Sequence, residues 1–166
     1  MMVGAITRTG MKPLWLLVPD AVGDREATIE KWELHHAEAS KTGWPLAFAV
    51  QDGMTIDDVP SGADVVFVGG TTEWKWKTVP MWCSNFDRVH VGRVNSLRRL
   101  WTCEDLGVES VDGTGWFRDT EKGKRMVQIE QWLDGYRNKT AEMFTVQETQ
   151  WRQPNGDRCG VRKEGE

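Results

Sequence analysis

Five apolar, strand-like stretches of the sequence each end in residues that could do chemistry. Two of these ends supply carboxylates, and the others supply an amide, a guanidinium group or a pair of glycines. The carboxyl ends of parallel strands meet at one edge of a sheet, which is where α/β proteins place their ligands. Together these groups could bind a heterocycle through its hydrogen-bonding edge, with an anion nearby. The candidate residues are Asp20, Gln51, Gly69, Gly70, Arg93, Asn95 and Asp112.

Each candidate also has an ordinary structural interpretation. Asp112 could cap the turn after its strand, and Asp20, which follows Pro19, could be a turn residue. The pair Gly69-Gly70 could form a tight turn with a nest of backbone N–H groups for a phosphate. His90 lies inside a strand and is interpreted as a satisfied core histidine.

Basic residues near the same strand ends suggest contact with phosphates. Arg93, Arg98 and Arg99 could form a basic ridge, although the last two could instead pair with the acidic residues 104–105. Tryptophan and lysine alternate over residues 74–77, which resembles a stacking and charged surface for nucleic acid. The start of an amphipathic helix explains that alternation almost as well.

The elements that must position these residues alternate regularly along the chain. The stretch at 14–18 is continuously apolar, which is typical of a strand covered on both faces in a parallel sheet. Asp24 is suited to cap the next helix, Asn95 or Ser96 a later one, and Gly107 to end that later helix. We expect strands at 14–18, 46–50, 64–68, 89–93 and 108–111, with another within 1–10, and helices at 25–41, 73–84, 97–106 and 121–136.

The spacing of these elements predicts an α/β fold of parallel βα repeats. Each unit takes roughly 25 residues, which is the rhythm of right-handed βα crossovers. A complete eight-unit barrel needs roughly 200 to 250 residues, so the chain can build about five or six units of a partial or small TIM-barrel-like architecture. We expect one domain over 1–138 and a loosely ordered C-terminal extension over 139–166.

Composition favours a globular protein of a reducing compartment. The chain has 166 residues, of which 39% are hydrophobic and 28% charged, and its net charge of −4 gives no overall basic signature for nucleic acid. Its three cysteines include no CxxC pair, which favours a cytoplasmic protein without a disulfide framework or zinc ribbon. No apolar run approaches the roughly 20 residues of a membrane helix, and we expect no membrane association or signal peptide.

The series PDAVGD, AFAVQDG, VFVGGTTEW, HVGRVNS and LGVESVDGT resembles the later units of the tRNA-guanine transglycosylase superfamily. It is most similar to phage and bacterial members related to the 7-deazapurine DNA-modification transglycosylases, which are queuine tRNA-ribosyltransferase-like proteins. The resemblance covers about residues 14 to 135, and its specificity comes from the order and spacing of short motifs. It implies exchange of a base at a glycosidic carbon through an aspartate nucleophile.

The resemblance assigns roles to individual residues. Asp112 matches the nucleophile, a role that suits a carboxylate because it can form and release a glycosyl ester. Asp20 matches the aspartate that recognises the purine edge, and Gln51 the glutamine near the carbonyl region of the base. Gly69 and Gly70 match the glycines whose backbone approaches the base closely, which a Cβ would block. We predict that Arg93 and Asn95 hold sugar or phosphate.

The sequence also departs from the family pattern. The cysteine cluster with histidine that binds zinc is missing, as are the N-terminal units carrying a second catalytic aspartate. The alternatives are therefore a catalytically inactive base- or nucleotide-binding protein, and a nucleotide N-glycosidase or phosphate-binding α/β enzyme.

The expected ligand is a purine or 7-deazapurine base, carried in DNA or in a nucleotide, and no metal or cofactor is implied. A barrel that lacks units would expose sheet edges, so we also expect a homo-oligomer or a partner subunit.

Overall fold

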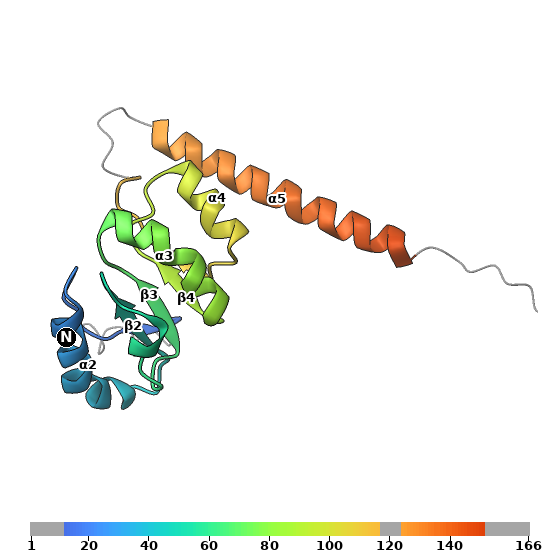
Figure 1. Cartoon of the computed structure of the whole chain (residues 1–166). Helices are drawn as coiled ribbons and strands as arrows, with labels where there is room; N and C mark the ends of the chain where they lie inside the picture. Colours follow the sequence, from blue (N-terminus) through green and yellow to red (C-terminus); the bar gives the residue numbers. More distant parts are fainter. Residues whose placement is uncertain (1–11, 117–123, 152–166) are drawn as a thin grey trace, which may run out of the picture.

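The computed structural model describes residues 12–116 and 124–151. Its five strands form one parallel sheet in which the spatial order follows the chain order, β1-β2-β3-β4-β5 (Figure 1). The sheet curls into a half-barrel, which confirms the predicted α/β fold with a partial TIM-barrel-like architecture. The strands are β1 (Leu16–Leu17), β2 (Leu46–Val50), β3 (Val65–Val68), β4 (Val89–Val91) and β5 (Ser110–Val111).

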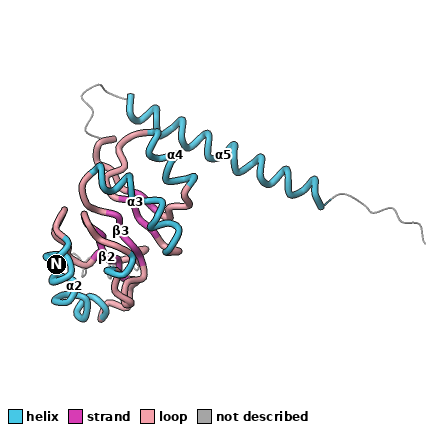
Figure 2. The backbone as a smooth tube through the Cα atoms, in the orientation of Figure 1, coloured by secondary structure: helices cyan, strands magenta, loops and turns pink. Residues whose placement is uncertain are grey.

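α-Helices connect successive strands except between β2 and β3, where the connection holds only a short 3₁₀ turn; Figure 2 shows these connections along the backbone. Asp24 caps the first of them as predicted, since its side chain accepts a hydrogen bond from the Ala27 N–H at 3.0 Å. Gly107 follows α4 with a φ of 70°, the left-handed conformation expected of a glycine that ends a helix. The helices are α2 (Arg25–Ser40), α3 (Thr72–Asn85), α4 (Leu97–Asp105) and α5 (Lys124–Trp151), with a 3₁₀ turn, η1 (Ile56–Asp58).

The register of the strands divides their side chains between two faces of the sheet. The outer face carries the β2 side chains Leu46, Phe48 and Val50. Leu46 is in register with Leu16 of β1, and Phe48 and Val50 are in register with valines of β3, which in turn pair with valines of β4. This face packs against the helices and forms the core. The helical partners include Trp32 from α2, Val79 and Trp82 from α3, and Leu100 and Cys103 from α4.

The inner face of the half-barrel carries a different set of side chains. Ala49, Phe67, His90 and Ser110 form one row across four strands, since each is the register partner of the next. Trp15 lies against this row, with its ring centroid 4.8 Å from that of His90. A histidine at the centre of an otherwise small and aromatic row is unusual for a purely structural face.

The last helix differs most from the sequence prediction. We expected a helix over 121–136, but α5 runs Lys124–Trp151 and extends away from the sheet beyond α4 (Figure 1). The domain boundary expected at 138/139 therefore falls inside this helix. Within the described part of the chain, no helix is long and apolar enough to cross a membrane. The strand expected within 1–10 and the tail from 152 lie outside the described residues.

Candidate functional site

A cavity of about 200 Å³ lies at the carboxyl ends of the first four strands. Five of the seven residues predicted from the sequence line it, namely Asp20, Gln51, Gly69, Gly70 and Arg93. The remaining lining residues are Leu17, Val22, Phe67 and Gly92. The cavity, called the strand-end cavity below, is smaller than the roughly 300 to 1,000 Å³ of pockets for drug-sized ligands. Its size suits a single ring system rather than a whole nucleotide.

Gln51 organises the wall of the strand-end cavity. Its side chain is fully buried, and its Oε1 accepts hydrogen bonds from the N–H groups of Gly70 at 2.8 Å and Gly23 at 2.9 Å. Its Nε2 donates to Asp20 Oδ2 at 2.8 Å. Both acceptor positions of the amide oxygen are thus used within the protein. In this structure Gln51 orients Asp20, and its direct contact with a base remains a prediction.

Asp20 lines the cavity, and its carboxylate is held by the protein at one oxygen. One oxygen, Oδ2, is held by Gln51, and Lys31 Nζ donates to the Asp20 backbone carbonyl at 2.6 Å. No hydrogen bond reaches Oδ1 from any of the described residues. A carboxylate held at one oxygen and available at the other can accept N–H groups from the edge of a heterocycle.

Neighbouring protein atoms leave no space for a side chain at the two glycines that follow β3. A Cβ on Gly69 would lie 2.9 Å from Gln51 Nε2, and one on Gly70 would lie 2.6 Å from Asp52 Oδ2. Gly70 also has a φ of 68°, which disfavours any side chain. Gly92 has the more direct effect on the cavity, because its Cβ would lie 2.8 Å from the Phe67 ring and 3.4 Å from Asp112 Oδ2.

Arg93 adopts a backbone conformation that is uncommon for a residue with a side chain. Its φ of 58° is the only positive value among the described residues other than glycine. The conformation lets the Arg93 N–H donate to Asp112 Oδ1 at 3.0 Å, while the guanidinium donates to the carbonyl of Gly70. Such strained residues concentrate at functional sites, where the surrounding structure holds them.

Asp112 follows β5 directly, and its carboxylate is fixed at both oxygens. Oδ1 accepts from Arg93, and Oδ2 lies 3.1 Å from His90 Nε2. The side chain nevertheless remains 50% exposed. An accessible carboxylate with a fixed orientation beside a cavity is suited to attack an electrophilic carbon.

His90 connects the inner face of the sheet to Asp112. Its Nδ1 lies 2.9 Å from Ser110 Oγ, and its ring stacks on Phe67 with centroids 4.7 Å apart. Burial lowers the pKa of His90 below its ordinary 6.5, although the hydrogen bond to Asp112 acts in the opposite direction. At neutral pH the ring is uncharged, so we assign the Nε2 proton to the bond with Asp112 and the Ser110 hydroxyl proton to Nδ1.

Asn95 lies outside the strand-end cavity. Its Oδ1 accepts from the Gly115 N–H at 2.8 Å, and its Nδ2 donates to the Arg93 carbonyl at 3.4 Å. Nearby, Trp116 Nε1 donates to the Val94 carbonyl at 2.7 Å. These bonds attach the segment after Asp112 to the segment after β4, so Asn95 supports the position of Asp112. Its predicted contact with sugar or phosphate remains a prediction.

Lys75 is a buried cation beneath the site. Only 1% of it is exposed, and its Nζ donates to the carbonyl of Gly92, which lines the strand-end cavity. Burial, together with the nearby positive charges of Arg93 and Arg99, lowers the pKa of Lys75 from 10.5 to about 8. Three cations therefore lie close together in a chain whose net charge is negative.

Sequence reasoning assigned no role to Phe67 or Gly92. It placed Lys75 on a possible stacking and charged surface for nucleic acid, but Lys75 is buried. Its interpretation of His90 as a satisfied core histidine is confirmed by the burial and hydrogen bonds of the ring, and only the contact with Asp112 was not foreseen. The sequence held one signal for the contact between His90 and Asp112, because both residues lie in the strand-end motifs of adjacent βα units. The contact of Lys75 depends on the path of α3 over β4, which no local pattern encodes. Within residues 12–116 and 126–139, no group of three or more His, Cys, Asp or Glu side chains could hold a metal ion.

Comparisons with known proteins give no independent assignment for this site. No family model matches the sequence, no curated protein matches it, and no solved structure matches the fold.

Proposed function

We propose that this chain binds a purine or 7-deazapurine base in the strand-end cavity and exchanges that base at a glycosidic carbon. The observation that carries the proposal is the carboxylate of Asp112, fixed at both oxygens yet half exposed, beside a cavity of single-ring-system size. Asp20 lies in the same cavity with one carboxylate oxygen available for the N–H groups of a base.

The reaction would proceed by two displacements at C1′ of the sugar. An oxygen of Asp112 attacks C1′, the bond from C1′ to the base breaks, and the departing base keeps the electron pair and takes up a proton. The incoming base then loses a proton and attacks C1′, which releases Asp112 as a carboxylate. The proton taken up in the first step balances the one released in the second.

The residues around Asp112 have defined parts in this scheme. The Arg93 N–H and His90 Nε2 hold the carboxylate in one orientation, which lowers the entropic cost of attack. Because His90 is buried and uncharged at neutral pH, it orients the nucleophile without neutralising it by proton transfer. Gln51 holds Asp20 for recognition of the base.

A second candidate is a nucleotide N-glycosidase in which water replaces the incoming base. The exposure of Asp112 favours it, because water can reach a glycosyl ester formed there. The two reactions differ in whether the product carries a new base.

The proposal is tested first by calorimetric titration with guanine and 7-deazaguanine. We expect binding to the native chain, loss of binding in Asp20→Ala, and retained binding in Asp112→Ala. Asp57→Asn, a carboxylate change on the exposed turn η1, is the matched control and should bind as the native chain does. If neither base binds the native chain, the proposal is wrong.

Turnover is tested by mass spectrometry with a guanine-containing DNA oligonucleotide and a labelled free base. Base exchange predicts a glycosyl adduct at Asp112 and incorporation of the label, both absent in Asp112→Ala. An adduct followed by an abasic product indicates the glycosidase. Binding without adduct or product indicates a base-binding protein that does not turn over.

The free thiols of Cys83 and Cys103 support placing this activity in a reducing compartment such as the cytoplasm.

A further inference from the structure

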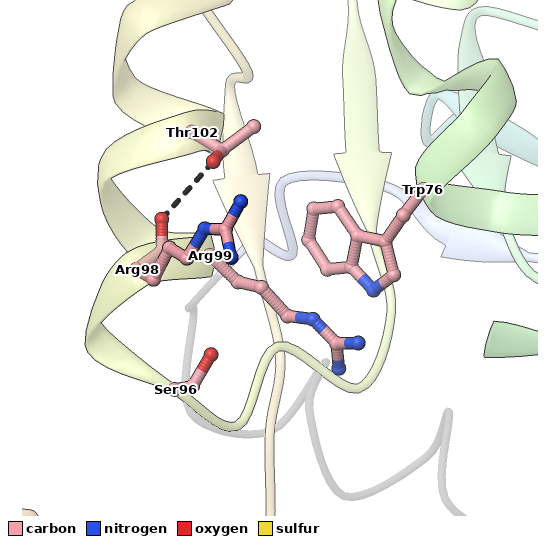
Figure 3. Close-up of a pocket in the computed structure, with 5 residues that line it drawn as sticks. All are labelled: Trp76, Ser96, Arg98, Arg99 and Thr102. Carbon is pink, nitrogen blue, oxygen red and sulfur yellow. Dashed lines mark hydrogen bonds between the residues drawn. The ribbon is translucent and has the colours of Figure 1, made fainter. Parts of the chain in front are cut away.

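A second, larger pocket lies between α3 and α4, as Figure 3 shows. Its volume is about 600 Å³, three times that of the strand-end cavity. The two arginine side chains extend from α4 on the side that faces the indole ring of Trp76 from α3 (Figure 3). The pocket, called the α3–α4 pocket below, is lined by Trp76, Ser96, Arg98, Arg99 and Thr102.

The two arginines of this pocket have no carboxylate partner among the described residues. Pairing with residues 104–105 was one interpretation of the sequence, but Asp105 instead lies 3.5 Å from Lys139 Nζ. Both arginines occupy the first turn of α4, which carries no acidic residue. Cations at that end of a helix oppose its dipole, so helix stability does not explain their presence.

Arg99 is held in place by the ring of Trp76. Its guanidinium carbon lies 4.8 Å from the ring centroid, which is the geometry of a cation–π contact. Stacking uses the face of the guanidinium and leaves its N–H groups available around the edge. An arginine stacked in this way binds an anion with less loss of side-chain entropy.

The α3–α4 pocket adjoins the proposed active site through Lys75. Lys75 Nζ donates to the carbonyl of Gly92, which lines the strand-end cavity, and lies 5.8 Å from the ring centroid of Trp76, which lines the α3–α4 pocket. Arg93 from one pocket and Arg99 from the other are both close enough to lower the pKa of Lys75 through charge repulsion. A band of four cations thus runs from one pocket to the other: Arg93, Lys75, Arg98 and Arg99.

We propose that the α3–α4 pocket binds a phosphate ester of the nucleotide chain that carries the exchanged base. Guanidinium groups bind phosphate oxygens through paired, charge-assisted hydrogen bonds, and the hydroxyl of Ser96 lies in the same pocket. The strand-end cavity is too small for a whole nucleotide, so sugar and phosphate must lie outside it. This inference rests on the proposed function, because it assigns the two pockets to parts of one substrate.

The test is the salt dependence of binding, measured by fluorescence anisotropy with a labelled single-stranded DNA oligonucleotide and the full chain. Each phosphate contact on single-stranded DNA contributes about 0.7 to the slope of log K against log salt. We therefore expect Arg98→Gln and Arg99→Gln each to weaken binding and lower the slope by about 0.7. Arg98→Lys should retain the slope, because it keeps the charge. Arg137→Gln, an arginine change on the exposed face of α5, is the matched control and should leave the slope unchanged.

A second arm identifies the source of the phosphate by calorimetry with deoxyguanosine and its 5′-monophosphate. If the monophosphate binds more tightly and Arg99→Gln removes that advantage, the pocket takes the phosphate of the same nucleotide. If the arginines affect the oligonucleotide alone, the pocket takes a neighbouring phosphate of the strand.

The inference is overturned if neither ligand depends on Arg98 or Arg99 more than on Arg137, or if no phosphate-bearing ligand binds. Free guanine lacks phosphate and should bind all these variants equally. Failure of guanine to bind the native chain would count against the proposed function. Arginine-dependent binding of the oligonucleotide would still be measurable in that case, so the two failures are distinguishable.

Discussion

Replacement of Gln51 by leucine tests whether the fully buried amide holds the strand-end cavity together. Leucine has a similar volume, so the change removes hydrogen bonds without leaving a large void. The buried Gly70 N–H would lose the acceptor that it has among the described residues, and Asp20 would lose the donor that orients it. The Gly23 N–H lies in an exposed turn and can bond to water instead.

The expected decrease in the free energy of unfolding is the sum of these separate losses. A buried N–H left without an acceptor costs about 1–3 kcal/mol, and loss of a hydrogen bond to a partly exposed carboxylate about 1–2 kcal/mol more. We expect Gln51→Leu to lower the free energy of unfolding by about 3 kcal/mol. For a chain of this length that corresponds to a decrease in Tm of about 6–12 °C.

The assay is urea unfolding followed by tryptophan fluorescence, together with calorimetric titration of guanine. The midpoint should fall while the slope m stays unchanged, because the surface exposed on unfolding is the same. Guanine affinity should fall as well, since Asp20 is no longer oriented. Gln131→Leu, on the exposed face of α5, is the control and should change stability by less than about 0.5 kcal/mol. A loss below about 1 kcal/mol in Gln51→Leu would refute the reasoning.

Three further variants test other parts of the site. Burial lowers the pKa of His90 below its ordinary 6.5 in the folded chain, so the stability of the native chain should fall as the pH drops below about 6.5. When Tm is measured from pH 8 to pH 5, His90→Gln should show a weaker dependence on pH. Lys75 has a pKa of about 8 against its ordinary 10.5, so the native chain should gain stability relative to Lys75→Met between pH 8 and 10.5 in urea titrations. Gly92→Ala should cost about 1–3 kcal/mol and abolish guanine binding, because its Cβ would meet the Phe67 ring at 2.8 Å. Gly62→Ala is the control for the glycine change, since its Cβ would meet nothing closer than 3.8 Å.

Each of these expectations has a contrary result. An unchanged pH dependence in His90→Gln would mean that another group controls acid stability. A constant difference between native chain and Lys75→Met across pH 8 to 10.5 would mean that Lys75 is not desolvated in solution. Normal guanine binding by Gly92→Ala would place the base elsewhere than the strand-end cavity.

The fold was predictable because each βα unit is encoded locally. The apolar run of β2, the cap at Asp24 and the stop at Gly107 are signals within one element, and all three agree with the structure. The clustering of Asp20, Gln51 and Arg93 was also predictable, since parallel strand ends meet at one edge.

Other features of the site depend on packing between elements and left no trace in the sequence. The bond from Lys75 to Gly92 joins α3 to the end of β4, and the stacking of Phe67 on His90 depends on the register of two strands. Asn95 is another residue whose contacts within the protein could not be predicted from the sequence. Its polarity and position predicted a ligand contact, which stays a prediction, whereas the bond that its amide oxygen accepts from Gly115 in the loop after β5 had no signal in the sequence.

The order of the strands has a consequence for how the chain acquires its site. Because every strand pairs with the one before it in sequence, each new unit can dock onto a finished edge as soon as it leaves the ribosome. The strand-end cavity is complete once β4 has docked, whereas Asp112 arrives only with β5, a strand of two residues at the edge of the sheet. Among the described strands, assembly therefore completes the strand-end cavity before it adds Asp112, the proposed nucleophile.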